Sequence, residues 1–291
     1  MNDAPQTIPV FTPPPISGYI ENPTGYKYKI IRPLKGGAFG VILLGVDIFE
    51  NTYAIKVFRP AGKTYDQVKT MWDQETKILR SLPHPYIAYL HDTFEYKYAF
   101  YLVFELLGEP LSKFVKGQPL LKDNIIIQIA RQLFYGLSFI HWHNIVHRDL
   151  SLDNVLFDRN GTTVKITDFG ISKEFEPAVQ NPKEPLYFNR AIICPDLIRF
   201  GFTIPQSDLY HVGLILLSLK LGQPPIDPKT EFKEIQRLCL EGHPRKLTES
   251  LNCPLGDKIA VLLRRRAEYR YRSAIDAWND FRSLLDTRHF D

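Results

Sequence analysis

The sequence contains no run of about 18 or more consecutive apolar residues, so we expect no transmembrane helix. Cysteine is also scarce, because only Cys194, Cys239 and Cys253 occur among 291 residues. Three widely spaced cysteines exclude a disulfide framework and a zinc motif. Free thiols fit a reducing compartment, and we expect an intracellular location, in the cytoplasm.

The first 25 residues have no apolar periodicity and contain six prolines. They also lack a basic segment that leads into an apolar one, so we expect no secretory signal. We interpret residues 1–25 as a flexible, extended arm. The alternative is an arm that packs on the fold through Ile8, Val10, Phe11 and Tyr19.

The charge balance is mildly basic, with a formal net charge of +4. This excess suits an anionic nucleotide, and we expect neither nucleic acid nor a membrane as a partner. The densest basic stretch contains Arg264, Arg265, Arg266, Arg270 and Arg272. We interpret it as a solvated helix face, and a site for a polyanion is the alternative.

Apolar patterns divide the chain into a β-rich first part and a helical second part. Short β-branched and aromatic runs predict strands at 26–34, 40–48, 52–58, 86–94 and 99–107. Apolar spacings of three and four predict helices at 65–82, 124–143, 207–222, 232–240, 256–266 and 273–285. In the second of these helices the predicted buried stripe is Ile125, Ile129, Leu133, Leu137 and Ile140. We therefore expect an α+β fold with one long helix in the β-rich part.

Residues 147–154 carry the strongest chemical signal. Asp149 is followed five positions later by Asn154, and Asp168-Phe169-Gly170 begins fourteen residues further on. This layout is typical of a phosphoryl-transfer site. In such a site Asp149 would orient the acceptor hydroxyl and take its proton, while Asn154 and Asp168 would hold Mg²⁺ beside the nucleotide phosphates.

Two features of the β-rich part fit a bound nucleotide. Gly36, Gly37 and Gly40 separate two predicted strands, and glycines let backbone N–H groups approach phosphates closely. The turn alone is equally compatible with an ordinary hairpin. Lys56 lies in an apolar strand, where an ammonium group needs a partner, and Glu75 is the partner we expect. The alternative is two exposed charges on separate elements.

Together these motifs resemble the eukaryotic-type protein kinase family over residues 26–291. Further motifs in the family's order are Ala54-Ile55-Lys56, His84-Pro85, Glu105-Leu106-Leu107, Cys194-Pro195-Asp196, Ser207-Asp208 with Gly213, and Arg272. The resemblance implies a bilobal fold with an N-lobe at about 26–107 and a helical C-lobe at about 108–291. It also implies ATP and Mg²⁺ as cofactors and a protein as substrate.

The resemblance implies roles for single residues. The catalytic set is Asp149, Lys56 and Glu75, and the metal ligands are Asn154 and Asp168. The nucleotide-binding set is Leu34, Gly36, Gly37, Gly40, Ile42, Ala54, Lys56, Phe104, Glu105, Leu107 and Leu156. In that set Ile42, Ala54 and Leu156 would enclose the adenine, and Phe104 would guard the back pocket. The spine of the active state would be Leu79, Leu90, His147 and Phe169, and Arg272 would pair with Asp196.

The sequence departs from the family pattern around the catalytic loop. Ser151 stands where the family usually has a lysine. Loss of one preorganised donor typically costs about 10²–10³ in rate, so we expect slower catalysis rather than none. Lys35, in the place of the usual first glycine, is a candidate replacement cation. Asn189 and Ile192 replace the usual Thr and Tyr, which predicts an altered substrate face.

The activation segment is also unusual, because residues 171–194 contain no threonine. Their only hydroxyl groups belong to Ser172 and Tyr187. We therefore expect activation without threonine phosphorylation. In this hypothesis a fixed anion for Arg148 comes from one of three residues, Glu174, Glu176 or Glu184.

The leading hypothesis is an active protein kinase that phosphorylates Ser or Thr rather than Tyr. It rests on the presence of Lys56, Asp149, Asn154 and Asp168. The alternative from another class is a pseudokinase, a nucleotide-binding interaction module with little turnover, which Ser151 motivates. A small-molecule kinase is the third hypothesis, and the motifs of the second half of the chain argue against it.

Overall fold

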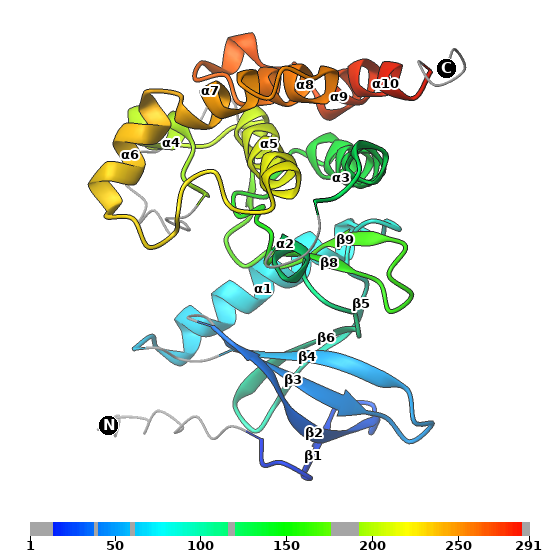
Figure 1. Cartoon of the computed structure of the whole chain (residues 1–291). Helices are drawn as coiled ribbons and strands as arrows, with labels where there is room; N and C mark the ends of the chain where they lie inside the picture. The colour runs from blue at the N-terminus through cyan, green and yellow to red at the C-terminus, as the bar shows by residue number, and fades with distance from the viewer. Residues whose placement is uncertain (1–13, 38–39, 59–61, 116–119, 176–191, 287–291) are drawn as a thin grey trace, which may run out of the picture. The chain divides into compact units, whose positions relative to one another are not determined.

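The computed structural model describes residues 14–37, 40–58, 62–115, 120–175 and 192–286, which form two compact units (Figure 1). The N-terminal unit consists of the described residues up to Pro83 together with 88–107. The C-terminal unit consists of 84–87 and the described residues from Gly108 onward. The sequence assigns 84–87 to the N-lobe. In the structure Ile87 instead bridges to Ile166, and the ring of His84 stacks on Phe139.

The N-terminal unit is built on a six-stranded antiparallel sheet (Figure 1). Its strands are β1 (Tyr19–Glu21), β2 (Lys27–Gly36), β3 (Gly40–Val46), β4 (Thr52–Phe58), β5 (Leu90–Tyr96) and β6 (Ala99–Glu105). Their order in the sheet is β1-β2-β3-β4-β6-β5. The core of the sheet gathers alternate apolar side chains, which include Ile30, Ile55, Tyr101 and Val103.

Strand β1 corrects the interpretation of residues 1–25 as a flexible arm. Residues 19–21 pair with β2, and Ile20 is buried in the core of the sheet. Tyr19, which was the expected anchor, is exposed. A strand of three residues is too short for its alternation to be recognised. The other expected anchors, Ile8, Val10 and Phe11, lie outside the described residues.

Helix α1 (Tyr65–Ser81) is held against the sheet by an aromatic side chain. A capping box between Thr64 and Gln67 starts the helix. Trp72 Nε1 donates a hydrogen bond of 3.1 Å to the carbonyl of Tyr101, and its ring stacks on Phe100 of β6. These contacts fix the helix whose next turn carries Glu75.

The C-terminal unit is mainly helical. Its helices are α2 (Leu111–Val115), α3 (Asp123–Trp142), α4 (Pro195–Phe200), α5 (Pro205–Leu221), α6 (Phe232–Leu240), α7 (His243–Glu249), α8 (Pro254–Leu262), α9 (Ala274–Phe281) and α10 (Ser283–Asp286), with a 3-10 turn η2 (Ala267–Tyr269). Two antiparallel pairs join β7 (Ile145–Val146) to β10 (Lys173–Glu174) and β8 (Val155–Phe157) to β9 (Val164–Ile166). Among the described residues, no helix is both long and apolar enough to cross a membrane.

Helix α5 forms the centre of the C-terminal unit. Every residue from Ser207 to Leu219 is buried, as its nearly continuous apolar pattern predicts. Helix α8 packs closely against it at Gly213, where a Cβ atom would lie only 2.9 Å from the Cβ of Leu262. The glycine therefore permits the close contact of the two helices.

Two predictions for the helical part were wrong. The stripe predicted on α3 includes Ile125, but this residue is exposed and its neighbour Ile126 is buried instead. The basic run was interpreted as a helix face, but α8 ends at Leu262, and Arg264, Arg265 and Arg266 follow the helix. After the cap residue Leu263 the chain leaves the helix, and it then enters the 3-10 turn η2.

Candidate active site

In the N-terminal unit, Lys56 and Glu75 form a buried ion pair. The ammonium nitrogen lies 2.7 Å from Oε1 and 2.8 Å from Oε2 of Glu75. The two side chains are only 8% and 2% exposed. Burial of an ion pair costs desolvation free energy that the pair itself hardly recovers, so its presence points to a use for the ammonium group. The structure thus brings together the two residues that the sequence pairs.

The glycine-rich turn contains one glycine that the packing requires. A Cβ atom on Gly40 would lie 2.5 Å from the carbonyl oxygen of Val57, whereas a Cβ on Gly36 would meet open space and one on Gly37 only an ordinary contact of 3.7 Å. The N–H of Gly37 donates to the carbonyl of Gly40 at 2.8 Å and closes the turn. Leu34 and Lys35 precede the turn and are exposed on β2.

The other nucleotide-binding candidates of this unit lie on neighbouring strands. Ile42 on β3 is paired with Lys56 on β4, and Ala54 on β4 is paired with Phe104 on β6. At the end of β6, Glu105 exchanges two hydrogen bonds with Tyr89. Its N–H donates to the Tyr89 carbonyl at 3.1 Å, and its Oε1 accepts from the Tyr89 N–H at 2.8 Å. Leu107 follows this strand end.

Of the two spine candidates of the unit, Leu79 is buried and Leu90 partly buried.

In the C-terminal unit, Asp208 at the start of α5 holds the loop that begins at His147. Its carboxylate accepts hydrogen bonds from the N–H groups of His147, at 2.8 Å, and Arg148, at 2.9 Å. These bonds hold Arg148 in the left-handed region with φ of 73°, which is costly for a residue with a side chain. Burial by itself raises the pKa of Asp208, but the contact with His141 Nε2 at 3.0 Å and nearby histidines lower it below its usual value. Asp208 therefore stays ionised.

The loop brings Asp149 and Asn154 together. Asn154 Nδ2 donates to the carbonyl oxygen and to Oδ2 of Asp149, each at 2.9 Å. Because Nδ2 donates both bonds, the amide oxygen is the side-chain atom of Asn154 that can bind a cation. The N–H of Thr167 donates to the carbonyl of Asn154 at 2.9 Å, which ties this loop to the segment of Asp168. Amide and carboxylate oxygens are ligands that Mg²⁺ prefers, so this donor set fits the metal.

His147 and Phe169 form an aromatic contact beneath the loop. The ring centroids are 4.8 Å apart, edge to face, and both residues are buried. Burial lowers the pKa of His147 below its usual value, so the imidazole is neutral at pH 7. Ser172 Oγ donates to the carbonyl of His147 at 3.0 Å. One of the two hydroxyls of the activation segment thus supports the loop.

Ser151, the departure from the family pattern, lines a small pocket. It is 6% exposed, and its hydroxyl has no hydrogen-bond partner among the described residues. The pocket, of about 180 Å³, is also lined by Ile192, Ile193 and several prolines. Ser151 and Ile192 therefore share one surface. Asn189, Tyr187, Glu176 and Glu184 lie outside the described residues.

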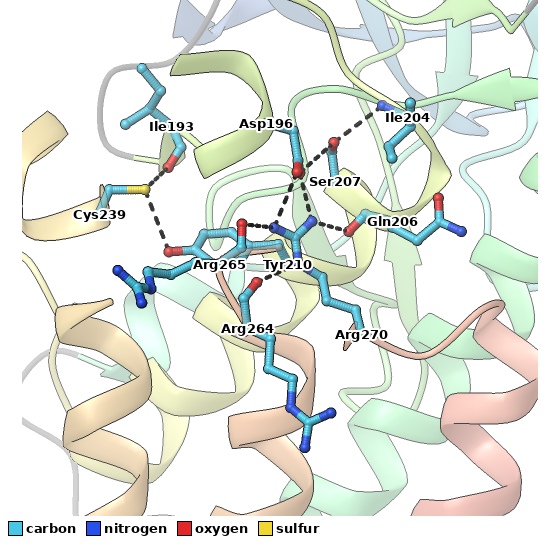
Figure 2. Close-up of polar contacts among 10 residues, drawn as sticks. All are labelled: Ile193, Asp196, Ile204, Gln206, Ser207, Tyr210, Cys239, Arg264, Arg265 and Arg270. Atoms are coloured by element: carbon cyan, nitrogen blue, oxygen red, sulfur yellow. Dashed lines mark hydrogen bonds and ion pairs between the residues drawn. The ribbon is translucent and has the colours of Figure 1, made fainter. Parts of the chain in front are cut away.

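A second network surrounds Asp196, and it corrects the predicted partner of that residue (Figure 2). Asp196 Oδ2 lies 2.6 Å from Nη1 of Arg270, whereas Arg272 is exposed. All five N–H groups of Arg270 are used, because the remaining ones reach Asp196 Oδ1 and the carbonyls of Gln206, Arg264 and Arg265. Arg270 rather than Arg272 is the partner of Asp196, because its guanidinium group also donates to the carbonyls that follow α8. The sequence alone could not reveal this.

A buried thiol continues this network. Cys239 Sγ donates to the carbonyl of Ile193 at 3.3 Å and lies 3.6 Å from the hydroxyl of Tyr210 (Figure 2). Burial raises the pKa of Cys239 to about 12 and that of Cys194 to about 11. Both thiols are therefore protonated at pH 7. No sequence motif indicated the contact of Cys239 with Ile193.

The sequence is similar to those of several known protein kinases. The probable serine/threonine-protein kinase PknB of Lactococcus lactis is 30% identical over 204 residues, which cover 69% of this chain and 32% of that protein. The serine/threonine-protein kinase PrkC of Bacillus subtilis is 28% identical over 203 residues, 69% of this chain and 31% of that protein. For mitogen-activated protein kinase 14 of Arabidopsis thaliana the identity is 30% over 214 residues, 70% and 57% of the two chains.

The chain thus spans between about a third and a little over half of the length of these relatives. A family model described as protein kinase domain matches residues 28–274, which is most of the sequence. The chain belongs to the protein kinase family.

Proposed function

We propose that the chain is an active kinase that transfers the γ-phosphoryl group of ATP to a protein hydroxyl, on Ser or Thr rather than Tyr. The observation that carries this proposal is the double hydrogen bond from Asn154 to Asp149. It fixes a carboxylate that orients the acceptor hydroxyl and takes its proton. The names of the bacterial relatives, which are serine/threonine-protein kinases, support the choice of acceptor.

The other proposed site residues act on the nucleotide. The ammonium of Lys56, held by Glu75, neutralises charge on its phosphates. Asn154 and Asp168 hold Mg²⁺, which when bound screens the negative charge of the phosphates. The proposed nucleotide-binding residues are Leu34, Gly36, Gly37, Gly40, Ile42, Ala54, Phe104, Glu105, Leu107 and Leu156.

In this proposal, the serine at position 151 lowers the rate of the kinase but does not abolish its activity. The usual lysine is one preorganised donor, and removal of one such donor typically lowers a rate by about 10²–10³. The same observation favours the second candidate function, a pseudokinase that binds nucleotide and serves as an interaction module. Against it, the two carboxylates and the amide of the proposed reaction centre are all present.

A phosphate-transfer assay separates the candidates. The chain is incubated with radiolabelled ATP, Mg²⁺ and casein, histone and myelin basic protein as generic acceptors. Two variants run beside it: Asp149→Asn, and the matched control Asp153→Asn, whose exposed carboxylate accepts a hydrogen bond from Ser112. Transfer that is lost in the first variant and kept in the second supports the proposal.

The other outcomes favour other functions. Binding of a fluorescent ATP analogue without any transfer would show a pseudokinase. Label that appears only on a small-molecule alcohol such as an aminoglycoside, supplied in a parallel reaction, would show a small-molecule kinase. Transfer that persists in Asp149→Asn would remove that carboxylate from the mechanism.

A further inference from the structure

Five arginines line one pocket of the C-terminal unit. Arg199 comes from α4, Arg245 from α7, and Arg264, Arg265 and Arg266 from the segment after α8. Tyr269 of η2 completes the lining of a hollow of about 570 Å³. None of the described residues that line the pocket carries a carboxylate, so these residues make it cationic.

The arginines are held in place but only partly neutralised. Arg245 pairs with Glu249 at 2.7 Å, and Arg266 lies 3.9 Å from Glu268. Arg264 Nη1 donates to the carbonyl of Tyr269 at 2.7 Å, and Arg265 Nη1 donates to that of Leu240 at 3.2 Å. A carbonyl fixes a guanidinium group without cancelling its charge. Among the described residues, two carboxylates against five guanidinium groups leave three positive charges in excess, and an anion would relieve their repulsion.

The buried ion pair between Arg270 and Asp196 supports the backbone of two of these arginines. Its Nε donates to the carbonyl of Arg264 at 2.7 Å, and its Nη2 donates to that of Arg265 at 3.3 Å. Figure 2 shows the side chains of Arg264 and Arg265 directed away from the Asp196–Arg270 pair. The backbone that carries two of the arginines is thus fixed before any ligand arrives, which lowers the entropic cost of binding.

We propose that this pocket binds a phosphorylated serine or threonine side chain of another protein. The planar guanidinium group binds phosphate through two parallel hydrogen bonds, and arginine clusters are a recurring means of recognising phosphorylated segments. The hollow is larger than a phosphate group and leaves room for flanking residues. Tyr269, which is 54% exposed, offers them an aromatic surface.

The shape of the site favours a phosphorylated peptide over nucleic acid. Nucleic acid presents a regular series of phosphates and is usually bound along an extended basic stripe. Here the cations come from three segments that surround one hollow. The site does not depend on phosphate transfer by this chain, so it stands or falls separately from the proposed activity.

The test measures binding of four fluorescent probes to the whole chain. The probes are a degenerate peptide library with one fixed phosphoserine, the same library with serine, an oligouridine RNA, and labelled inositol hexakisphosphate. The pocket variant is Arg199→Gln with Arg265→Gln. The matched control is Arg131→Gln with Arg282→Gln, which removes two exposed arginines outside the pocket.

We expect the phosphoserine library to bind at least about tenfold more tightly than the serine library, because its bonds are charge-assisted. The pocket variant should lose at least about tenfold of that affinity, and the control should stay within about twofold. Equal binding of the two libraries, tighter binding of RNA or inositol hexakisphosphate, or full binding by the pocket variant would overturn the proposal. Thermal melting checks the fold, and if the double variant is unfolded, the exposed Arg266→Gln takes its place with the same expectation.

Discussion

Two buried carboxylates among the described residues of the C-terminal unit, Asp208 and Asp196, organise their surroundings in different ways. Asp208 binds mainly backbone: it accepts from the N–H groups of His147 and Arg148, and it also contacts the ring of His141. Asp196 binds a side chain, that of Arg270. The two networks meet on α5, where Ser207, the neighbour of Asp208, donates to Asp196 Oδ2 at 3.0 Å. The first turn of α5 therefore takes part in both networks.

The two networks fix different segments of the C-terminal unit. The Asp208 network fixes the loop of Asp149 and Asn154, whose positions the proposed chemistry requires. The Asp196 network fixes the backbone of Arg264 and Arg265, whose side chains point away from it (Figure 2). The surface formed by these side chains can therefore vary without a change in the network. Ser151, where the chain departs from the family pattern, and the arginine pocket both lie outside the hydrogen bonds of the Asp208 network. The proposed chemistry and the proposed recognition can therefore change separately.

Loss of the Asp208 carboxylate should have the largest effect. Asp208→Ala leaves two buried N–H groups without an acceptor and releases the left-handed backbone of Arg148. We expect the free energy of unfolding to fall by about 3–5 kcal/mol, as when one partner of a buried charged group is removed. Phosphate transfer should fall to background. Urea unfolding followed by circular dichroism measures the first quantity, and a loss below about 1 kcal/mol would contradict the role of this network.

Arg270→Met should have a slightly smaller effect. It leaves Asp196 buried and unpaired, so we expect the free energy of unfolding to fall by about 3 kcal/mol. The matched control, Arg272→Met, should change it by no more than about 0.5 kcal/mol, because Arg272 is exposed. The double variant Asp196→Leu with Arg270→Met should recover part of the loss, since no unpaired charge remains. If Arg272→Met proved the more costly change, the assignment of the ion pair would be wrong.

His211 on α5 makes stability depend on pH. Burial lowers its pKa to about 4, while Asp208, His147, Arg270 and Asp196 contribute smaller electrostatic effects. Between pH 4 and the unfolded pKa of about 6.5, the unfolded chain binds more protons, so stability falls as the pH falls. For this group the loss from pH 7 to pH 5 is about 2 kcal/mol.

His211→Leu should remove this contribution. Urea unfolding of both chains at pH 7 and pH 5 gives the comparison. The unaltered chain should lose about 2 kcal/mol more than the variant on acidification. Equal losses in the two chains would show that His211 is not held neutral by burial.

Ser151→Ala should have the smallest effect. The hydroxyl is buried without a described partner, so its removal should raise the free energy of unfolding by up to about 1 kcal/mol. The rate of phosphate transfer should change by less than about threefold. A fall of about tenfold or more, with unchanged stability, would instead assign the hydroxyl to substrate binding.

Much of this architecture could be predicted from local patterns. Helix α6 has the predicted bounds, and α3 begins and ends within one residue of the prediction, because both carry regular apolar spacing. The pairing of Lys56 with Glu75 was predictable, since a lysine in an apolar strand needs a partner and a helix followed that could supply one.

The remaining features depend on tertiary contacts that no pattern reveals. Arg270 and Arg272 are the same residue type two positions apart, and the carbonyls left after α8 select between them. Strand β1 is defined by its pairing with β2 rather than by its own composition. That Asp208 accepts hydrogen bonds can be recognised only in the fold, where α5 contacts the loop that begins at His147.

The most direct test of the central claim is the initial rate of phosphate transfer at saturating ATP and Mg²⁺, compared between the unaltered chain and Asp149→Asn. If Asp149, held by Asn154, acts as the base, the unaltered chain transfers phosphate measurably. The variant should then lose about 10³ or more of that rate while its affinity for nucleotide stays the same. Equal rates in the two chains, whether measurable or at background, would contradict the account.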